Sequence, residues 1–186
     1  MDDTTTTLLV VIALLMVAGV AVWLYMRKRR SAALRERFGP EYERAVHVAG
    51  EPMKAEAILE ERARRVEQLN LRPLSPTDRD RLAEAWRRIQ ARFVDEPQLA
   101  VVDGDRLIVE AMRARGYPVE NFDQRADDLS VHHSDVVHHY RAGREIALRH
   151  QRGEAGTEDL RQAMVHFRAL FAELIEANPN KTRRAS

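Results

Sequence analysis

The sequence predicts an all-α protein in which an N-terminal transmembrane helix is followed by a bundle of five or six helices. Three observations predict this class. Residues 8–26 form an uninterrupted apolar run. After this run, apolar residues recur at helical spacing between breaks made by proline and glycine. No stretch alternates polar and apolar residues for long enough to predict a strand.

The apolar run, LLVVIALLMVAGVAVWLYM, is long enough to cross a bilayer as one helix. At about 1.5 Å per residue it would extend roughly 28 Å, close to the thickness of the hydrocarbon core. A secretory signal peptide would carry basic residues before its apolar core, whereas this chain carries Asp2 and Asp3 there. We therefore expect an uncleaved membrane anchor.

The residues around the run predict how it lies in the membrane. Four basic residues follow it directly, and none precedes it: Arg27, Lys28, Arg29 and Arg30. Cytoplasmic flanks are enriched in such residues, so we expect residues 1–7 outside and everything after Met26 in the cytoplasm. Trp23 and Tyr25 fall where aromatic rings prefer the headgroup interface, although either could instead pack against a neighbouring helix.

Residues 27–38 are predicted to continue the helix as a basic juxtamembrane segment, which ends at the break Gly39-Pro40. Two interpretations of the basic cluster remain open. It is either the ordinary flank of a single span or, together with Arg35 and Arg37, a polybasic patch that binds anionic lipid.

Composition limits the functions of the rest of the chain. About 160 residues follow the anchor, enough for one domain with a single core. The whole chain has 30 Lys plus Arg against 29 Asp plus Glu, so a general nucleic-acid surface is not expected. The chain has no cysteine, which excludes disulfides, thiolate metal sites and a cysteine nucleophile. There is no phosphate-binding glycine loop and no Gly-x-Ser-x-Gly elbow.

Proline, glycine and polar caps divide the predicted bundle domain, residues 39–177, into helices. The predicted segments are 41–49, 52–70, 76–93, 97–115, one or two turns within 121–129, a helix from Ser130 or Ser134 to 152, and 157–177. Ser75 and Thr157 are predicted N-caps, and Ser134 or Ser130 is predicted to cap the helix that ends at 152. Residues 178–186 are predicted to be a disordered tail.

Apolar stripes predict which faces of these helices are buried. In the segment 52–70 the stripe consists of Ala55, Leu59, Val66 and Leu69. On the opposite face, Glu60 with Arg64 and Glu61 with Arg65 are predicted i,i+4 pairs. The aromatic residues at core spacing are Trp86, Phe93, Phe167 and Phe171, and we interpret them as packing residues, not as a cofactor site.

One cluster of potential ligands suggests a metal site. Its residues are His132, His133, Asp135, His138 and His139. Asp135 and His139 are one helical turn apart and could supply two ligands, but zinc would need a third from another element, such as His47, His150 or His166. The alternative is that these histidines cap or cover a helix surface. The same histidines could respond to pH, because imidazole titrates near pH 6.5.

A second candidate is the acidic pair Asp103 and Asp105, which flanks Gly104. Two carboxylates could bind a divalent ion, but within a regular helix these side chains would point about 200° apart. We interpret them as exposed acids beside a glycine that weakens the helix.

Several phrases together resemble one known group of proteins. They are residues 86–90, Phe93-Val94-Asp95-Glu96-Pro97, Arg115-Gly116-Tyr117-Pro118, Ser130-Val131-His132-His133 and Thr157-Glu158-Asp159-Leu160-Arg161. In this order they resemble a family of bacterial proteins with one N-terminal span and a helical domain. The resemblance covers most of residues 34–176. It implies a bacterial inner membrane and a helical domain, but no activity and no functional residue, because none is established for the family.

Two departures from the family pattern argue against a metal or catalytic role. This chain has Gly104-Asp105 where the family often has Ala-Asp, and His133-Ser134 where it often has His-Pro. The first hypothesis is therefore a non-enzymatic module without a cofactor that contacts the bilayer and binds a protein partner or itself. The second is a metal- or small-ligand-binding sensor or enzyme built on the histidine cluster. In the first view Tyr117, Pro118 and Phe122 pack the bundle or meet a partner, and in the second they line a pocket.

Overall fold

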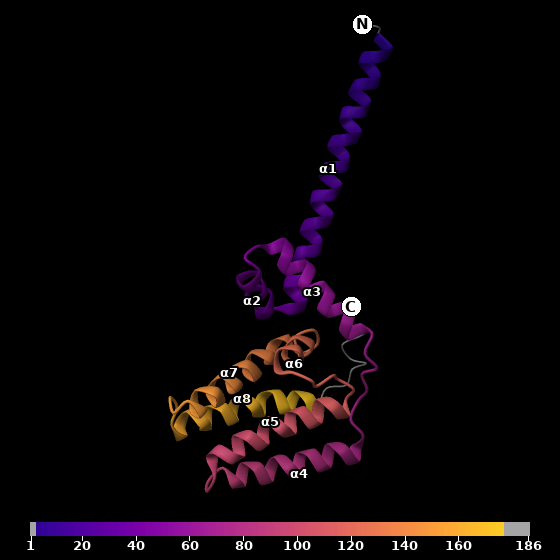
Figure 1. Cartoon of the computed structure of the whole chain (residues 1–186). Coiled ribbons are helices and arrows are strands. Elements are labelled where there is room, and N and C mark those ends of the chain that lie inside the picture. The colour runs from indigo at the N-terminus through magenta and orange to yellow at the C-terminus, as the bar shows by residue number, and fades with distance from the viewer. Residues whose placement is uncertain (1–2, 177–186) are drawn as a thin grey trace.

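The computed structural model describes residues 3–176, with side chains from residue 11 on, and within this range the chain forms eight helices and no strand (Figure 1). The helices are α1 (Asp3–Phe38), α2 (Pro40–Ala49), α3 (Pro52–Glu67), α4 (Pro76–Arg92), α5 (Pro97–Ala114), α6 (Phe122–Leu129), α7 (Ser134–Gln151) and α8 (Thr157–Glu176). The all-α prediction is confirmed. Seven described helices follow α1, where the sequence predicts five or six, because α2 and α6 are complete short helices. The predicted tail, residues 178–186, lies outside the described residues.

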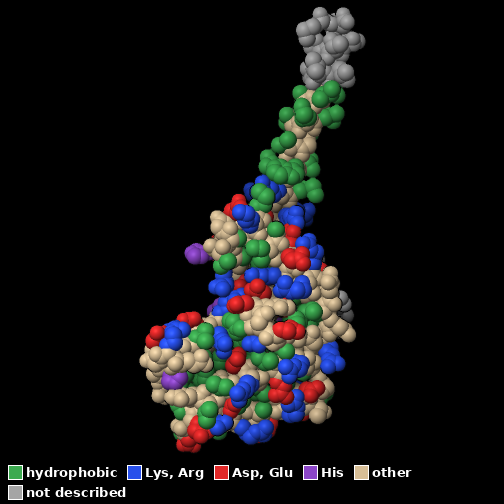
Figure 2. All heavy atoms as spheres, in the orientation of Figure 1, with side chains coloured by type: hydrophobic (Ala, Val, Ile, Leu, Met, Phe, Trp, Pro, Cys, Tyr) green, Lys and Arg blue, Asp and Glu red, His purple; other side chains and the backbone are tan. Residues whose placement is uncertain are grey.

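Helix α1 projects from the rest of the protein as one continuous helix of 36 residues (Figure 1). It runs through the basic flank and ends at Phe38, as predicted, because Gly39 adopts a positive φ of 47° and Pro40 begins α2. The region Val11–Phe38 contains a window that is long and apolar enough to cross a membrane, and none of that window is buried in the protein. Figure 2 shows apolar side chains on the projecting part and basic side chains where it meets the other helices.

The apolar side chains form two cores, where the sequence predicts one. The larger, here called the bundle core, lies among α4, α5, α7 and α8. All four predicted packing aromatics belong to it: Trp86, Phe167 and Phe171 are buried, and Phe93 packs against its edge. The rings of Trp86 and Phe171 stack with centroids 4.8 Å apart. Close helix packing depends on Gly143, because a Cβ there would lie 2.5 Å from the Phe167 ring.

The smaller core, here called the stalk core, joins the end of α1 to the hairpin of α2 and α3. Its buried residues are Leu34, Phe38, Tyr42, Ala45, Ala55, Leu59, Ala63, Val66 and Val131. The predicted stripe on residues 52–70 is therefore buried, and Leu69 packs against its end. Polar contacts join α3 to α1: Ser31 Oγ lies 2.6 Å from Glu56 Oε1, and Arg37 contacts Glu67 at 3.3 Å. The two helices run in the same direction, because the Ser31–Glu56 contact and the Arg37–Glu67 contact advance together along both.

The predicted helix caps have mixed outcomes. Ser75 Oγ accepts a hydrogen bond from the Asp78 amide at 3.0 Å, which confirms that cap. The cap predicted at Ser134 or Ser130 is wrong, because Ser134 is already the first residue of α7 and Ser130 Oγ donates to the Asp127 carbonyl at 2.6 Å. Thr157 is likewise inside α8, where Asp159 instead accepts from the Gly156 amide at 2.9 Å.

The predicted pairs on the wet face of α3 are wrong, because their members bind partners elsewhere. Glu60 pairs with Arg30 of α1, and Arg65 reaches Asp128 of α6. Arg64 contacts Glu61 at 2.7 Å, one residue closer along the helix than predicted. Long side chains therefore link α3 to its neighbours instead of only covering its surface.

Candidate functional site

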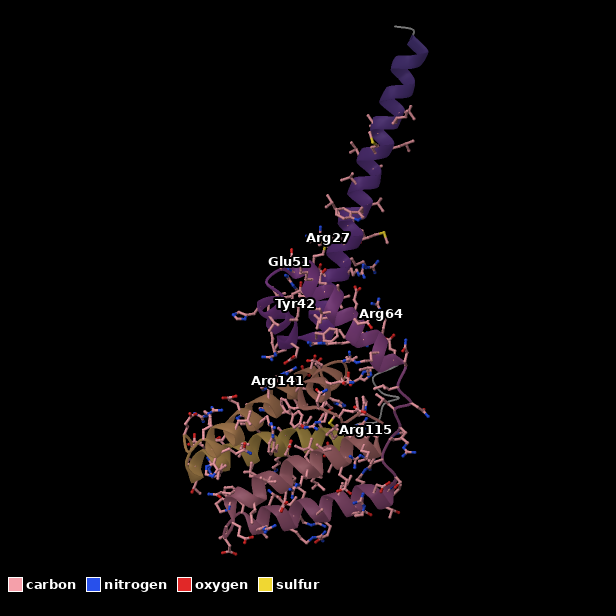
Figure 3. All side chains as sticks on the ribbon, in the orientation of Figure 1. Arg27, Tyr42, Glu51, Arg64, Arg115 and Arg141 are labelled. Atoms are coloured by element: carbon pink, nitrogen blue, oxygen red, sulfur yellow. The ribbon has the colours of Figure 1, made fainter. Side chains whose placement is uncertain are left out.

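Charged side chains fill the region where the hairpin of α2 and α3 meets α6 and α7. Two arginines of the network lie on α3 and one on α7, and their carboxylate partners lie on α2 and α6. The residues are Glu41, Arg62, Arg65, Asp127, Asp128 and Arg141, and we call them the junction network. Figure 3 shows Arg141 reaching from the bundle toward the hairpin. The network therefore connects the part of the chain that carries the stalk core to the part that carries the bundle core.

Asp127 is the centre of the junction network. Its Oδ2 lies 2.9 Å from Arg62 Nη2, and its Oδ1 lies 2.9 Å from Arg141 Nη2. Arg141 also contacts Glu41 Oε2 at 3.2 Å. Glu41 is only 3% exposed, so this ion pair is largely shielded from water. One carboxylate on α6 thus connects α3 to α7, and α7 in turn connects to α2.

Asp128 makes a second, deeper contact beside Asp127. Its side chain is fully buried, and its Oδ1 accepts from Arg65 Nε at 2.9 Å and Nη2 at 2.5 Å. Burial raises the pKa of Asp128, and the Arg65 guanidinium opposes this shift. Burial also lowers the pKa of Arg62. The Arg65 guanidinium therefore partly offsets the cost of burying the Asp128 carboxylate.

A small cavity of about 170 Å³ opens beside this network, and we call it the junction cavity. It is lined by Arg44, Ala45, Val48, Ile58, Arg62, Asp123, Asp127 and Arg141. A wider groove of about 600 Å³ continues from it and shares Arg44, Asp123 and Arg141. The groove adds Phe122, Ala142, Arg144, Glu145 and Leu148. Val48 is 72% exposed and Ile58 is 42% exposed, so the cavity has an apolar rim open to solvent.

Two arginines along this surface have only distant carboxylate partners. Arg44 reaches Glu41 at 3.9 Å, and Arg144 reaches Asp105 at 3.9 Å while its guanidinium lies 5.5 Å from the centre of the Phe122 ring. By contrast, Arg62 and Arg141 both have a carboxylate within 2.9 Å. Arg44 and Arg144 therefore have hydrogen-bond donors that could bind an external carboxylate.

The junction network is not among the sites predicted from the sequence, although α3 contains a signal for it. Arg62 lies three residues after Leu59 and four before Val66, within the apolar stripe, where a solvated arginine is not expected. An arginine in such a position predicts a buried carboxylate partner. The partner, Asp127, belongs to the segment 121–129, whose helical character the sequence left open.

The predicted metal cluster is divided between two places. His132 and His133 precede α7 and lie against the core. His133 is 5% exposed, and its Nδ1 lies 3.3 Å from Glu173 Oε1 on α8. Burial and the charges of His133, Arg37 and Arg115 lower the pKa of His132 to about 4. Asp135 lies exposed in the first turn of α7.

The other two histidines lie further along α7, where His139 faces α8 and His138 is exposed. His139 Nδ1 is 2.9 Å from His166 Nδ1, and the rings of His138 and His139 have centroids 3.9 Å apart. Burial lowers the pKa of both His139 and His166. Among the residues that the structure describes, no group of three or more His, Asp or Glu side chains has an arrangement that could hold a metal ion. His166, named as a candidate third ligand, thus meets only one member of the predicted cluster in a hydrogen bond.

The acidic pair at Gly104 diverges as the helical geometry predicts. Asp103 contacts Arg92 at 2.7 Å, whereas Asp105 faces Arg144. Gly104 itself is buried, because Met164 and Phe167 lie over it. The pair is therefore divided between two surfaces of α5.

The loop after α5 is structural at its start. Arg115 is 2% exposed, and its Nη1 donates to the carbonyl of Leu174 at 2.9 Å, near the end of α8 (Figure 3). Tyr117 is 3% exposed within the bundle core, and burial raises its pKa to about 12. Phe122 packs on Tyr140 and also lines the groove. Tyr117 thus packs inside the bundle. Phe122, the first residue of α6, packs against Tyr140 and also faces the groove.

The predicted membrane-interface residues all lie exposed on α1: Trp23, Tyr25, Arg27, Lys28, Arg29 and Arg30. The Arg27 guanidinium lies 5.4 Å from the centre of the Trp23 ring. Arg30 is the member of this set that reaches the folded domain, through its pair with Glu60. The other three basic side chains, Arg27, Lys28 and Arg29, are exposed on the surface of α1.

Compared with protein-family models, curated proteins and solved structures, the chain matches none. The resemblance to the bacterial single-span family therefore stays a prediction from the quoted phrases.

Proposed function

We propose that the protein is a membrane-tethered helical module that binds a protein partner at the cytoplasmic face of a bacterial inner membrane. Residues 8–26 would form the span, with residues 1–7 outside. The length, composition and exposure of α1 support the span. The basic cluster that follows it supports the orientation, and the family resemblance alone supports the bacterial setting.

The observation that carries the binding role is the junction cavity together with its groove. A preformed hollow has an apolar residue, Ile58, at its rim, and the groove that continues from it includes Arg44 and Arg144, whose own carboxylate partners are distant. Interfaces commonly combine a small apolar anchor with charged groups that fix orientation. The matching partner is a protein segment that presents an apolar side chain flanked by carboxylates.

The experiment measures binding of defined peptides to the full chain in lipid nanodiscs. One labelled peptide pool contains a single leucine flanked by glutamates, and a matched pool has lysines in their place. We expect the glutamate pool to bind, and we expect Arg44→Glu combined with Arg144→Glu to weaken it about tenfold or more, equivalent to roughly 1.4 kcal/mol. Arg106→Glu, whose side chain is 76% exposed on α5, is the matched control and should change binding little.

Three results would count against this function. Equal binding of both pools would remove the charge argument. Unchanged binding by the doubly substituted protein, with an unchanged melting temperature, would place the peptide elsewhere. A dimer that forms with rising protein concentration and is lost in the double variant would replace the external partner by a second copy of this chain.

A further inference from the structure

The tip of the hairpin formed by α2 and α3 lies level with the basic cluster of α1. Ser31 on α1 contacts Glu56 on α3 at 2.6 Å, and the two helices run in the same direction. Met53 precedes Glu56 by three residues, and Lys28 precedes Ser31 by three, so Met53 lies at the height of Lys28, about 4.5 Å above this contact. Figure 3 likewise places Glu51 close to the height of Arg27.

This height corresponds to the headgroup layer if residues 8–26 fill the hydrocarbon core. Lys28 is two residues beyond Met26, or about 3 Å, whereas the headgroup layer is roughly 5–7 Å thick on each side. Packed helices lie about 8–10 Å apart, so a typical tilt of about 20° would raise or lower the tip by only about 3 Å. The folded domain thus begins at the membrane surface, with no linker between them.

The tip exposes apolar side chains at this height. Val48 at the end of α2 is 72% exposed, Met53 at the start of α3 is 60% exposed, and Pro52 between them is also exposed. The one carboxylate at the turn, Glu51, is paired with Lys54 at 2.5 Å. The tip therefore presents an apolar surface whose nearest acid is neutralised, next to the basic cluster of α1.

We propose that this hairpin tip is a second membrane contact, in which Val48, Pro52 and Met53 enter the headgroup layer of the bilayer that holds α1. The proposal rests on the membrane anchor proposed above. Apolar side chains bind the boundary between headgroups and acyl chains, and basic side chains bind anionic phospholipid. With α1 in the bilayer and the tip at its surface, the domain contacts the membrane at two points. The domain therefore cannot rotate freely about α1. The second contact also orients the junction groove relative to the membrane.

The test uses single-cysteine variants, because the chain has no cysteine of its own. Met53→Cys and Val48→Cys place an environment-sensitive NBD probe at the tip, and each leaves the other apolar residue intact. Lys28→Cys marks the end of the span, and Val94→Cys marks the turn between α4 and α5, where Val94 is 82% exposed. Each full-length labelled protein is reconstituted in phosphatidylcholine and phosphatidylglycerol vesicles that contain a lipid with a nitroxide on its headgroup.

We expect the nitroxide to quench the probes at positions 48 and 53 nearly as strongly as the probe at position 28, and to leave the probe at position 94 almost unquenched. The contact is overturned if positions 48 and 53 are quenched no more than position 94 while position 28 is quenched. If position 28 is not quenched either, the membrane anchor itself fails. If the probes at positions 48 and 53 are unquenched but report an apolar environment that is lost as the protein is diluted into lipid, a second copy of the chain covers the tip, and this would also overturn the contact.

Discussion

The bundle core and the stalk core differ in what holds them together. The bundle core is formed by large side chains, with Trp86 stacked on Phe171 and Phe167 packed against Tyr140. The stalk core contains three alanines among its nine buried residues, and ion pairs such as Arg30–Glu60 surround it. Packing of large apolar surfaces contributes more free energy than exposed ion pairs do. The bundle is therefore expected to be the more stable part.

This difference has a consequence for the junction between the two regions. Apart from Val131, which follows α6 and is buried in the stalk core, and the partly buried Leu69 and Leu71, which pack against both cores, the regions are joined by the junction network. Polar junctions open more readily than apolar ones, because water can replace their partners. We expect the hairpin of α2 and α3 to exchange its amide hydrogens at lower opening free energies than the bundle helices.

The largest expected effect comes from the same truncation made in each core. Phe167 and Phe38 are both fully buried. Phe167→Ala should lower the free energy of global unfolding by about 3–5 kcal/mol, because it empties the centre of the bundle. Phe38→Ala should leave bundle unfolding nearly unchanged and increase hydrogen exchange in α2 and α3. Chemical denaturation with hydrogen-exchange mass spectrometry measures both, and equal loss of global stability in the two variants would contradict the comparison.

A smaller effect tests the close packing of the bundle. A Cβ at Gly143 would lie 2.5 Å from the Phe167 ring, which is rigid and buried. Gly143→Ala should therefore destabilise the bundle by about 1–3 kcal/mol, despite the better helix propensity of alanine. Gly156→Ala is the control, because nothing lies within 4 Å of its Cβ position. A more stable Gly143→Ala protein would mean that α7 and α8 are not closely packed at this position.

Asp127→Asn tests whether the junction network holds the two regions together. The amide cannot replace the charge between Arg62 and Arg141, so we expect a loss of about 1–3 kcal/mol confined to the junction. Hydrogen exchange should rise in α2, α3 and α6, while α5 and α8 stay protected. Asp123→Asn, at an exposed position one turn earlier on the same face of α6, should have little effect. If both variants behave alike, the network does not join the regions.

Acidification should weaken the region around His132. Its pKa is lowered to about 4, mainly by burial and further by His133, Arg37 and Arg115, whereas Glu67 acts in the opposite sense. The folded protein thus favours neutral His132. The stability that this gives is fully present above the ordinary histidine pKa of about 6.5, and it is lost as the pH falls toward 4. The melting temperature of the wild type should fall more steeply over this window than that of His132→Gln. His47→Gln, at an exposed position of α2, should follow the wild type. Parallel curves for the wild type and His132→Gln would contradict the assignment.

The helices could be predicted from local signals, because their boundaries are set by nearby residues. Gly39-Pro40 ends α1, and prolines begin α4 and α5, where the sequence places these breaks. Leu59 and Val66 were identified as buried from spacing alone. The junction network could not be predicted in the same way. Arg65 and Asp128 are 63 residues apart, and no sequence pattern near either residue identifies the other as its partner. The predicted histidine cluster is divided for the same reason. The surroundings of these histidines depend on where α8 packs, and local sequence patterns do not predict that position.

The smallest expected effect concerns metal binding at His138, His139 and His166. The Nδ1 atoms of His139 and His166 are 2.9 Å apart, a hydrogen-bond distance at which one ring donates and the other accepts. Two imidazole ligands of tetrahedral zinc would lie about 3.3 Å apart, and both nitrogens would have to face the ion unprotonated. We expect zinc, nickel or a chelator to shift the melting temperature of the full chain no more than that of the triple Gln variant. A rise of several degrees with metal, present only in the wild type, would mean that α7 and α8 separate slightly to admit an ion. The packing of α7 against α8 would then change when metal binds. The contrast between a tightly packed bundle and an adaptable stalk would no longer hold.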